Sequence, residues 1–568
     1  MSVTLQNQGA LRKVAILGRL ETAEDRAALL AALPAGSAGQ AITLELDFYD
    51  ADTLPGDIIE ALAETLDGGG QVKIVAYRAL LAHGLLRLGL PVLQIPSQSR
   101  RTPLAECRAL VLAGSAQSLD KILYIVERLP LTRATVFVAQ HVGEDQENLL
   151  DRLLKARTEY SVLMPQHLTA VQPGALYVAP PGHHLRVAHG LIYLTRDRKI
   201  QFSRPSIDVL FESVAGEYGD KALAVLLCGF GQDGVAGCAA LKDTDACVII
   251  EDGEECGPAR VMPDSARHAG RYDHVMRCPV IASVAAAAVA GAGAAPTGPL
   301  LDLFLEAVNS QQGYDLRHYQ RDGLERRIRN LMLRFGLGGF ADFQRAVFSD
   351  PVLFERLLAE LSVGVTRFFR HPEQFLELRE KILPYLSSFP VIKVWSAGCA
   401  SGEEAYSLAI LLDELGLLER SRLFATDANP YLLELARSGL FPAEPLAVNR
   451  ENYLASGGPR LFDVHVPPAG RFLKARDRLR KHILFHRHSL VSEGVFNEFQ
   501  LIVCRNVMIY FDAELQEQAL ERFSRSLHRD GFLMLGPQDG LRHLAQARGF
   551  TPCAAGSHIY RLRDGAPP

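Results

Sequence analysis

Three residue types that cooperate in acyl chemistry each follow an apolar run in the middle of the chain. Ser115 comes directly after Gly114, which ends an apolar run. His141 follows the apolar run 135–139, and Asp233 lies in the loop after the apolar run 222–227. Such runs are typical of buried strands, and the carboxyl ends of parallel strands meet at one edge of a sheet. A serine, a histidine and a carboxylate at that edge can act as nucleophile, general base and orienting group. The pattern predicts a hydrolytic site, with helix amides beside Ser115 that can stabilise an oxyanion.

A second group of candidate residues lies in the C-terminal half. The apolar run 391–396 is followed by the glycine-containing turn 397–402 and then by helical periodicity. Asp427 ends the next apolar run, about two dozen residues beyond Glu404, where one carboxylate can accept hydrogen bonds from both ribose hydroxyls. The turn has neither the G-x-G-x-x-G pattern nor a following lysine, which disfavours a phosphate-bearing ligand. A nucleoside without phosphates, such as S-adenosylmethionine, fits better.

Structural explanations compete with each of these assignments. Ser401 followed by Glu404 has the spacing of a capping box at a helix start. Asp427 is a common turn residue at the end of a strand, and Tyr510 and Phe511 can be core aromatics. A lone serine such as Ser115 carries almost no information about function.

The chain as a whole has the composition of an ordinary globular protein. Its 568 residues are too many for one core, so several domains are expected. A net charge of -5 does not indicate nucleic acid as a partner. The start, 1–13, does not have the pattern of a secretory signal, and no run is long and apolar enough to insert into a membrane, so we expect a cytoplasmic protein. The nine cysteines are never spaced as C-x-x-C, so neither disulfides nor a metal site are expected.

Composition shifts divide the chain into blocks. The stretch 283–299 is rich in Ala, Gly and Pro and is predicted to be a linker. A weaker boundary near residue 98 separates the block 1–98 from the block 104–282. Strand-like runs alternate with helical periodicity in every block except 300–380, which is predicted to be helical throughout. The predicted fold class is therefore multidomain α/β with one all-helical subdomain, and a last domain at 381–568.

Long motifs in the C-terminal half resemble a known family. They are VTRFFR at 365–370, VWSAGCASGEEAYS at 394–407, ATDA at 425–428 and CRNVMIYFD at 504–512. In this order they resemble the CheR family of chemotaxis receptor glutamate methyltransferases, over about 313–562. The resemblance implies a Rossmann-like domain that binds S-adenosylmethionine and carries a small β insertion at 441–485. It further implies these site residues: Thr366, Arg370, Glu404, Asp427, Ser489, Leu490, Arg505 and Asn506 against the cofactor, with Arg370 and Tyr510 beside the reacting groups.

Two positions depart from the family pattern. Gly364 stands where the family usually has Asn, and Ser489 stands where another Asn helps to hold the cofactor. Both changes are expected to weaken cofactor affinity without abolishing activity.

A basic helix precedes these motifs. Leu324, Ile328, Leu331 and Phe335 share one helical stripe, and Arg326, Arg327, Arg329 and Arg334 lie off it. The resemblance implies that this subdomain docks the acidic methylation helices in the cytoplasmic part of chemoreceptors. A solvated basic face is the alternative.

The middle block resembles the CheB family of receptor methylesterases over 107–275. The resemblance rests on the chain order Ser115, His141, Asp233 and on the segments YVAPPGHH at 177–184 and RPSIDVLF at 204–211. It implies a doubly wound parallel-sheet domain in which Ser115 attacks a glutamate methyl ester, His141 moves the proton and Asp233 orients the imidazole. The family's GASTGG loop is AGSAQS at 113–118 here, and a methionine of the aspartate loop is Phe230.

The N-terminal block is predicted to be a small α/β unit. Strands are expected at 14–17, 42–46 and 72–75, and helices at 22–33, 56–66 and 79–88. Gly18-Arg19 replaces the acidic pair that a phosphoacceptor receiver domain needs for Mg²⁺. The block is weakly similar to STAS domains, which implies binding of other chemosensory proteins through 1–98, with Thr53 as a candidate phosphorylation site.

Together these features predict a bifunctional receptor-adaptation protein that adds methyl groups from S-adenosylmethionine to receptor glutamates and hydrolyses the esters. One alternative is a methyltransferase whose esterase-like domain is inert and serves as a scaffold. Two further alternatives are a scaffold in which neither site works and a methyltransferase that acts on a small molecule. The complete 504–512 motif argues against the former, and the large helical subdomain argues against the latter.

Overall fold

The computed structural model describes residues 2–8, 11–17, 27, 29–31, 43–48, 54, 56–67, 71–76, 85, 90, 92–94, 106–142, 150–291, 293–312, 314–361, 366–470, 472–491, 493–494 and 497–562. The chain forms two compact units. The middle unit comprises residues 98–317 and 321–354, and the outer unit comprises 1–97, 318–320 and 355–568. Each unit has its own sheets and its own cores.

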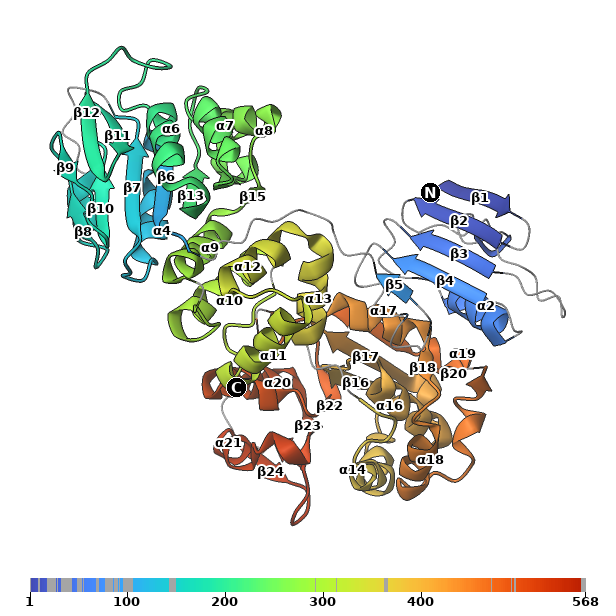
Figure 1. The fold of residues 1–568 in the computed structure, drawn as a ribbon. Helices are drawn as coiled ribbons and strands as arrows, with labels where there is room; N and C mark the ends of the chain where they lie inside the picture. Colours follow the sequence, from blue (N-terminus) through green and yellow to red (C-terminus); the bar gives the residue numbers. More distant parts are fainter. Residues whose placement is uncertain are drawn as a thin grey trace. The chain divides into compact units, whose positions relative to one another are not determined.

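A seven-stranded sheet in which all neighbouring strands are parallel forms the centre of the middle unit (Figure 1, cyan and green). In sheet order its strands are β15 (His274–Met276), β14 (Cys247–Glu251), β13 (Ala222–Leu226), β6 (Ala109–Gly114), β7 (Thr135–Gln140), β10 (Ala175–Val178) and β8 (Ser161–Leu163). Strands β6, β7 and β13 are buried at every position, as in a parallel sheet covered on both faces. The predicted α/β class and the predicted doubly wound parallel sheet are confirmed.

Helices and a small sheet surround these strands. The helices are α4 (Leu119–Glu127), α5 (Leu150–Lys155), α6 (Ile207–Tyr218), α7 (Val235–Asp243) and α8 (Val261–Ala269), and the short turn η1 is Ala116–Ser118. The antiparallel small sheet has the order β11 (His184–Ala188), β12 (Leu191–Thr195) and β9 (Thr169–Ala170). Helix α6 contacts β6, β7 and β13, and so connects the three strands whose ends carry the predicted hydrolytic residues.

The predicted linker at 283–299 is wrong for its first half. Residues 283–290 belong to helix α9 (Cys278–Ala290), which is buried along nearly its whole length. Alanine has the highest helix propensity, and its small side chain lets a helix pack closely on all sides. Helix α9 contacts β6, β13 and β14 as well as the following helix α10 (Gly298–Gln312). The alanine-rich composition of this segment is therefore that of a buried helix and not that of a linker.

Within the described residues the prediction that 300–380 is helical is confirmed for most of the segment, but residues 314–320 and 366–371 are not helical. After α10 come α11 (Arg321–Arg334), α12 (Phe340–Ser349), α13 (Pro351–Leu361) and α14 (Pro372–Glu377). The predicted stripe on α11 is buried at Leu324, Ile328 and Leu331. Arg326 and Arg329 are exposed, so α11 presents basic side chains outside its apolar stripe.

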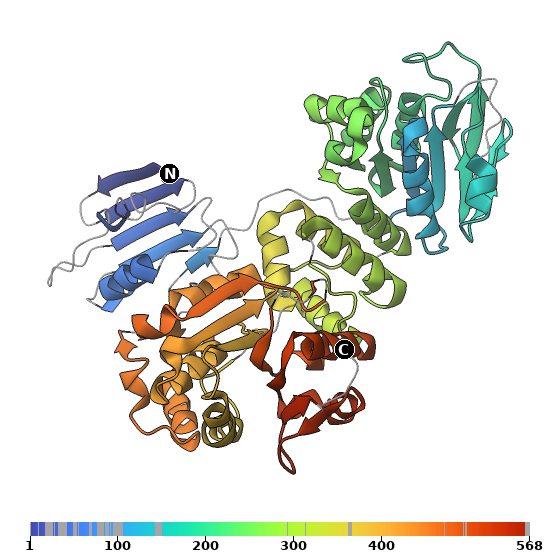
Figure 2. The ribbon, with the colours of Figure 1, turned by 180° about the vertical axis from the view of Figure 1, so that it is seen from behind.

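The outer unit contains a second seven-stranded sheet (Figure 2, orange and red). In sheet order its strands are β21 (Ile483–Arg487), β17 (Ser421–Asp427), β16 (Ile392–Ala397), β22 (Phe499–Cys504), β23 (Leu527–Leu535), β25 (Ile559–Leu562) and β24 (Phe550–Pro552). The first five are parallel, and β25 is antiparallel to both its neighbours. The Rossmann-like prediction is confirmed.

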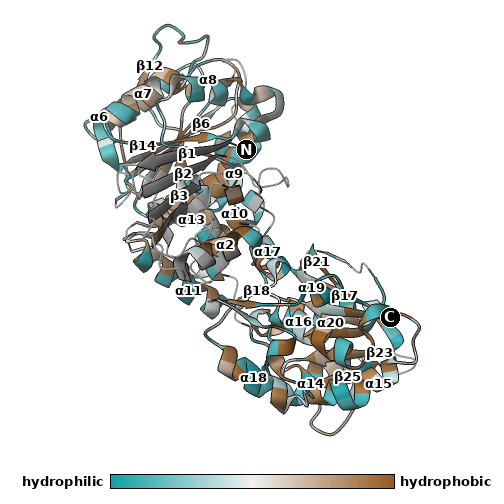
Figure 3. Ribbon diagram, turned by 90° about the vertical axis from the view of Figure 1, so that its right-hand side faces the viewer, coloured by the Kyte–Doolittle hydropathy of each residue, from teal (hydrophilic) through white to brown (hydrophobic). Residues whose placement is uncertain are grey.

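The helices of this part are α15 (Leu383–Leu386), α16 (Glu403–Glu414), α17 (Pro430–Ser438), α18 (Leu446–Ala455), α19 (Asp477–Arg480), α20 (Ala513–Ser526) and α21 (Arg542–Ala547). Surface helices carry both hydrophilic and hydrophobic residues, as the teal and brown segments of α18 show (Figure 3).

A small antiparallel sheet is inserted before β21, with the order β18 (Leu440–Pro442), β20 (Phe472–Lys474) and β19 (Pro468–Ala469). The predicted β insertion at 441–485 is therefore present, but its predicted end is wrong. Residues 483–485 belong to β21, which pairs with β17 in the large sheet. A short edge strand has the same composition as a strand of a small sheet, and this explains the error.

The N-terminal block forms a five-stranded sheet in the order β1 (Ser2–Gln8), β2 (Leu11–Leu17), β3 (Thr43–Phe48), β4 (Gln71–Ala76) and β5 (Val92–Gln94), with helix α2 (Gly56–Asp67). The three predicted strands and the predicted helix 56–66 are confirmed. Strand β1 was not predicted, because its polar residues Gln6, Asn7 and Gln8 conceal the alternation. Gly18, Arg19, Thr53 and most of the predicted helices 22–33 and 79–88 lie outside the described residues.

Within the described residues, no helix is both long and apolar enough to cross a membrane.

Candidate functional sites

Three adjacent strands carry the predicted hydrolytic residues at their carboxyl ends. Ser115 follows β6, His141 follows β7 and Asp233 lies in the loop after β13. In the sheet β6 lies between β13 and β7, so the serine is flanked by the other two. The sheet topology thus brings Ser115 and Asp233 to the same edge, although they are 118 positions apart in the sequence.

His141 and Asp233 form the hydrogen bond that such a site requires. His141 Nε2 lies 2.7 Å from Asp233 Oδ2. The carboxylate also accepts hydrogen bonds from the Ser206 hydroxyl at 2.8 Å and from the amides of Ile207 and Asp208 at 2.8 and 3.0 Å. These groups begin helix α6, where amides point towards a negative charge. Asp233 is therefore fixed from several directions and can orient the imidazole.

Two carboxyl groups near this contact have opposite pKa shifts. Burial tends to raise the pKa of Asp233, but the hydrogen bonds from His141 and from the α6 amides outweigh it and lower the pKa. Burial raises the pKa of Asp208 to about 6, and the nearby charge of Asp233 adds to the rise. Asp208 Oδ1 accepts the amides of Gly234 and Gly237 at 2.9 and 2.7 Å, which anchors the Asp233 loop to α6.

The Ser115 hydroxyl donates its hydrogen bond to Gln117 Oε1. Among the described residues no hydrogen bond joins Ser115 to His141, so the proton of the nucleophile points to an amide carbonyl instead of the base. Ser115 is 7% exposed, which leaves little room for water to compete with Gln117. The sequence marked position 117 only as the loss of a family glycine, so this contact was missed.

The backbone around Ser115 is tightly packed against the loop after β13. The Ser115 amide donates to the Cys228 carbonyl at 3.1 Å. A Cβ on Gly229 would lie 2.9 Å from the Ser115 Cβ, so only glycine fits there. Phe230 follows and is half exposed, and Ala116 begins the turn η1. The nucleophile is therefore positioned by 228–229 as well as by β6.

The second site lies at the carboxyl ends of strands β21, β17, β16 and β22 of the outer unit. Asp427 ends β17, and its two carboxylate oxygens accept the amides of Ala400 and Asn429 at 3.0 and 2.8 Å. Burial raises the pKa of Asp427, and the hydrogen bonds from these amides partly offset the rise. Each oxygen retains a lone pair, so the carboxylate can still accept from two ribose hydroxyls.

The turn after β16 is shaped by glycine. Gly398 has a φ of +76°, and a Cβ there would lie 2.4 Å from Val507 Cγ2. Gly402 has a φ of +100°, and a Cβ there would lie 2.8 Å from that of Ala436. No larger residue fits at either position, because the backbone of the turn packs closely against Val507 and Ala436.

Glu404 is buried and paired with Arg505. Their closest nitrogen and oxygen atoms are 3.4 Å apart, and Glu404 Oε1 accepts from Ser396 Oγ at 2.8 Å. Burial raises the pKa of Glu404, and Arg505 partly offsets the rise. The capping-box explanation is wrong, because Gly402 is the cap of α16 and Ser401 Oγ donates to Glu403.

Arg505 connects this pair to the segment before β16. Its Nε donates to Gln374 Oε1 at 2.8 Å, and its Nη2 donates to the Arg370 carbonyl. The sequence reasoning missed Gln374, which no motif marked. Arg370 is thereby held near Glu404 through one shared guanidinium.

An unpartnered polar atom at this edge provides a test of the cofactor fit. Asn506 Nδ2 is buried and has no hydrogen-bond partner in the described part of the chain. Asn506 has a φ of +57°, and its amide donates to Asp539 Oδ2 at 3.2 Å. Its side-chain donor is therefore available to a ligand acceptor. Together with Asp427 and the Gly398 turn, this arrangement fits the adenosyl and amino-acid groups of S-adenosylmethionine.

The remaining predicted residues have other contacts, and none of them is seen to touch Asp427 or Asn506 in the described part of the chain. Leu490 is buried after β21, and Ser489 Oγ accepts the Val491 amide at 3.2 Å. Tyr510 is half-buried, and its carbonyl accepts the Gln320 amide at 2.8 Å. Thr366 lines a hollow of about 460 Å³, together with Ser401, Glu403 and residues of β18. Gly364 lies outside the described residues.

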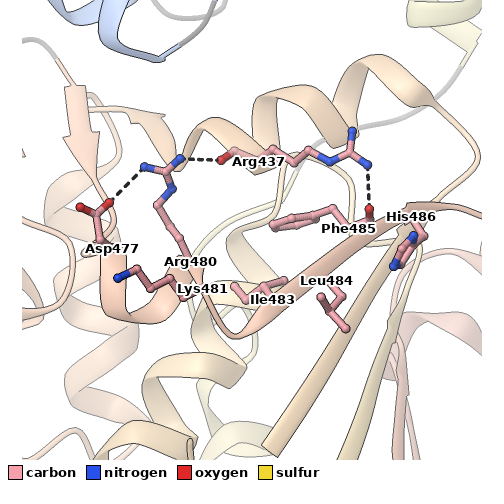
Figure 4. Close-up of a pocket in the computed structure, with 8 residues that line it drawn as sticks. All are labelled: Arg437, Asp477, Arg480, Lys481, Ile483, Leu484, Phe485 and His486. Carbon is pink, nitrogen blue, oxygen red and sulfur yellow. Dashed lines mark hydrogen bonds and ion pairs between the residues drawn. The ribbon is translucent and has the colours of Figure 1, made fainter. Parts of the chain in front are cut away.

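A separate hollow of about 460 Å³ lies beside the edge strand β21 (Figure 4). Its two arginines are engaged within the fold. Arg437 donates to the Phe485 carbonyl at 2.7 Å, and Arg480 contacts Asp477 at 3.2 Å and the Arg437 carbonyl at 3.1 Å. Because both arginines already have acceptors within the fold, they support the edge strand β21.

Comparison with known proteins shows which families the two domains resemble. Residues 364–556 match the family described as CheR methyltransferase, SAM binding domain, and residues 299–362 match the CheR methyltransferase, all-alpha domain. Cher3 of Pseudomonas putida, named as a methyltransferase, is 39% identical over 46% of this chain and 95% of its own length. The chain belongs to the CheR family of methyltransferases. A chemotaxis protein methyltransferase of Listeria monocytogenes is 32% identical over 41% of this chain and 87% of its own length.

This CheR chain also carries a CheB methylesterase domain, which matches at residues 110–284. The catalytic domain of the CheB methylesterase from Thermotoga maritima is similar in structure, with 28% identity over 32% of this chain and 97% of that one, and a TM-score of 0.30. The predicted relationship to both families and the predicted cofactor S-adenosylmethionine are confirmed.

Proposed function

We propose that this protein adds methyl groups to glutamate side chains of chemoreceptors at one site and hydrolyses the resulting esters at the other. The observation that carries the proposal is that one chain holds two separate strand-end sites. One presents Asp427, Arg505 and Asn506 to a nucleoside, and the other presents Ser115, His141 and Asp233 to an ester.

At the methyltransferase site the protein's task is to bind and align. Asp427 would accept the ribose hydroxyls, Asn506 Nδ2 would donate to the cofactor, and Glu404 with Arg505 would form the wall beside its amino-acid group. Thr366, Ser489 and Leu490 complete the pocket. S-adenosylmethionine supplies an electrophilic methyl group when it is bound.

The substrate carboxylate is ionised at neutral pH, so it needs no general base. Arg370 and Tyr510 hold it in line with the methyl group, and exclusion of water increases its reactivity. A guanidinium suits this role because its planar fork matches a carboxylate.

At the methylesterase site His141 accepts the Ser115 proton as the hydroxyl oxygen attacks the ester carbonyl. Asp233 stabilises the resulting imidazolium, and His141 then returns the proton to the methanol that leaves. Water hydrolyses the acyl-serine by the same route. Before attack, Ser115 must exchange its hydrogen bond to Gln117 for one to His141.

The substrate partner in this proposal is the acidic methylation helix of a receptor, which places the protein in the cytoplasm. The exposed basic residues Arg326 and Arg329 of α11 complement such a helix. The proposed domain division is 1–98, 104–282 together with the rest of helix α9, 300–380 and 381–568. The block 1–98 is a STAS-like module for other chemosensory proteins, with Thr53 as its candidate phosphorylation site.

One observation favours a second candidate function, in which the esterase-like domain is inert and the chain acts as a methyltransferase with a scaffold. That observation is the contact between Ser115 and Gln117, which withholds the nucleophile from its base. Release of methanol from a receptor fragment carrying glutamate methyl esters distinguishes the two. The bifunctional proposal requires release that Ser115→Ala abolishes.

Calorimetry with S-adenosylmethionine tests the first site. Asp427→Ala is expected to abolish binding, whereas the control Asp477→Ala, an exposed aspartate of α19, is expected to bind as the parent does. Binding that survives Asp427→Ala would contradict the assignment of the ribose contact.

A further inference from the structure

Behind the Ser115 loop, the fold brings two cysteines together. Cys228 follows β13 and Cys256 lies in the irregular turn η3 (Gly253–Arg260), and they join Ala259 in one small buried cluster. The two sulfur atoms and a carboxylate oxygen of Glu251 all lie within 4.8 Å of one another. Cys228 and Cys256 are 2% and 8% exposed.

A lysine already neutralises the carboxylate of this cluster. Lys121 Nζ forms an ion pair with Glu251, donates to the Glu255 carbonyl at 3.2 Å and lies 3.8 Å from Cys256 Sγ. Glu251 also accepts the Cys228 amide at 2.7 Å. Because the ammonium already bonds to the carboxylate and approaches one of the sulfurs, the geometry favours chemistry between the two sulfurs over a metal site.

The two thiols are not equivalent. A hydrogen bond from Cys256 lowers the pKa of Cys228, despite the opposing effect of burial. The same hydrogen bond, together with burial, raises the pKa of Cys256. A thiolate is the reactive form of cysteine, so the directions of the two shifts favour Cys228 as the attacking sulfur, and the close approach of the sulfurs lets Cys256 resolve it.

We propose that Cys228 and Cys256 form a peroxide-reactive dithiol site whose oxidation to a disulfide switches off the methylesterase site. The Cys228 thiolate attacks one oxygen of hydrogen peroxide, the O–O bond breaks and hydroxide leaves, which gives a sulfenic acid. Cys256 Sγ then attacks the Cys228 sulfur, the S–S bond forms and the S–O bond breaks, and the departing hydroxide takes the Cys256 proton as water. The pair loses the two electrons that reduce the peroxide.

The link to catalysis runs through the backbone. A disulfide needs an S–S distance of about 2.05 Å, so the sulfurs must move closer together. The Cys228 carbonyl accepts the Ser115 amide, and the neighbouring Gly229 amide donates to the Ala259 carbonyl at 2.7 Å. Closing the bond pulls on both connections, and a displacement of about 1 Å at a catalytic group can cost about 100-fold in rate.

The site test uses the full chain, treated with hydrogen peroxide, digested and mapped by mass. A peptide pair joined through Cys228 and Cys256, lighter by two hydrogens and separated by dithiothreitol, is the expected result. Cys256→Ser is expected to remove it, and Cys238→Ala, which replaces a buried cysteine of α7, is expected to retain it. Recovery of both residues as free thiols, or stoichiometric bound zinc that protects them, would overturn the proposal.

The proposed inhibition by oxidation rests on the proposed methylesterase function, so it is measured in a separate activity assay. Oxidation is expected to lower kcat/KM for methanol release by about 100-fold in the parent and in Cys238→Ala, but to leave Cys256→Ser unchanged. Cross-linking without this loss would overturn the coupling. A reduced parent that releases no methanol would refute the methylesterase function instead, and the peptide map would still decide whether the dithiol site exists.

Discussion

Replacing Gln117 with alanine is expected to increase methylesterase activity. In the structure the Ser115 hydroxyl donates to Gln117 Oε1, and this bond must break before His141 can accept the proton. A neutral hydrogen bond of this kind contributes about 0.5 to 1.5 kcal/mol net. If that amount is removed from the barrier, kcat/KM rises between about twofold and about tenfold.

Methanol release from a receptor fragment carrying glutamate methyl esters is the assay. Ser115→Ala defines the background, and Gln166→Ala, at an exposed glutamine outside the site, is the matched control. If Gln117 instead assists catalysis, Gln117→Ala lowers methylesterase activity. If its side-chain amide turned to donate to the oxyanion, its loss would lower kcat by about 10² to 10³. A decrease of that size would refute the view that Gln117 withholds the nucleophile.

Other expected outcomes follow from the buried charges. Asp233→Asn is expected to lower kcat for methanol release by about 10⁴, because the amide cannot hold the imidazolium, while methyl transfer is unchanged. Glu404→Ala leaves Arg505 buried without its carboxylate and is expected to lower the free energy of unfolding by about 3 to 5 kcal/mol in urea titrations, whereas Glu404→Gln loses less. Burial raises the pKa of Asp539 to about 6, so the native state binds more protons than the unfolded state between about pH 4 and pH 6. The free energy of unfolding therefore falls as the pH rises through that window, by at most about 3 kcal/mol, and Asp539→Asn is expected to remove that part of the slope. A parallel pH dependence in the variant and the parent would contradict this.

Much of the chemistry could be predicted because strand ends carry it. Ser115, His141 and Asp233 each follow an apolar run, and the rule that parallel strands end at one edge was enough to group them. Asp427 could be placed in the same way, whereas the role of Glu404 came from the family resemblance. The long motifs added Asn506 and Arg505, which have no periodic signal of their own.

The contacts that the sequence did not reveal join segments far apart in the chain. Gln374 bonds to Arg505 across 131 positions, and Cys228 meets Cys256 only because β13 and β14 are neighbours. The role of Gln117 depends on the direction in which its side chain points, and the spacing of residues in the sequence does not show that direction. Alanine-rich composition indicated a linker at 283–299, but the same composition suits the close packing of helix α9.

The central claim is that one chain both makes and removes the same ester. The most direct test incubates the full chain with a receptor cytoplasmic fragment and S-adenosylmethionine labelled in the transferred methyl group, and follows label in protein and in methanol. The account predicts label in protein followed by labelled methanol, protein-bound label that accumulates without methanol in Ser115→Ala, and neither product in Asp427→Ala. Labelled methanol that forms equally in Ser115→Ala, or protein labelling that persists in Asp427→Ala, would contradict it.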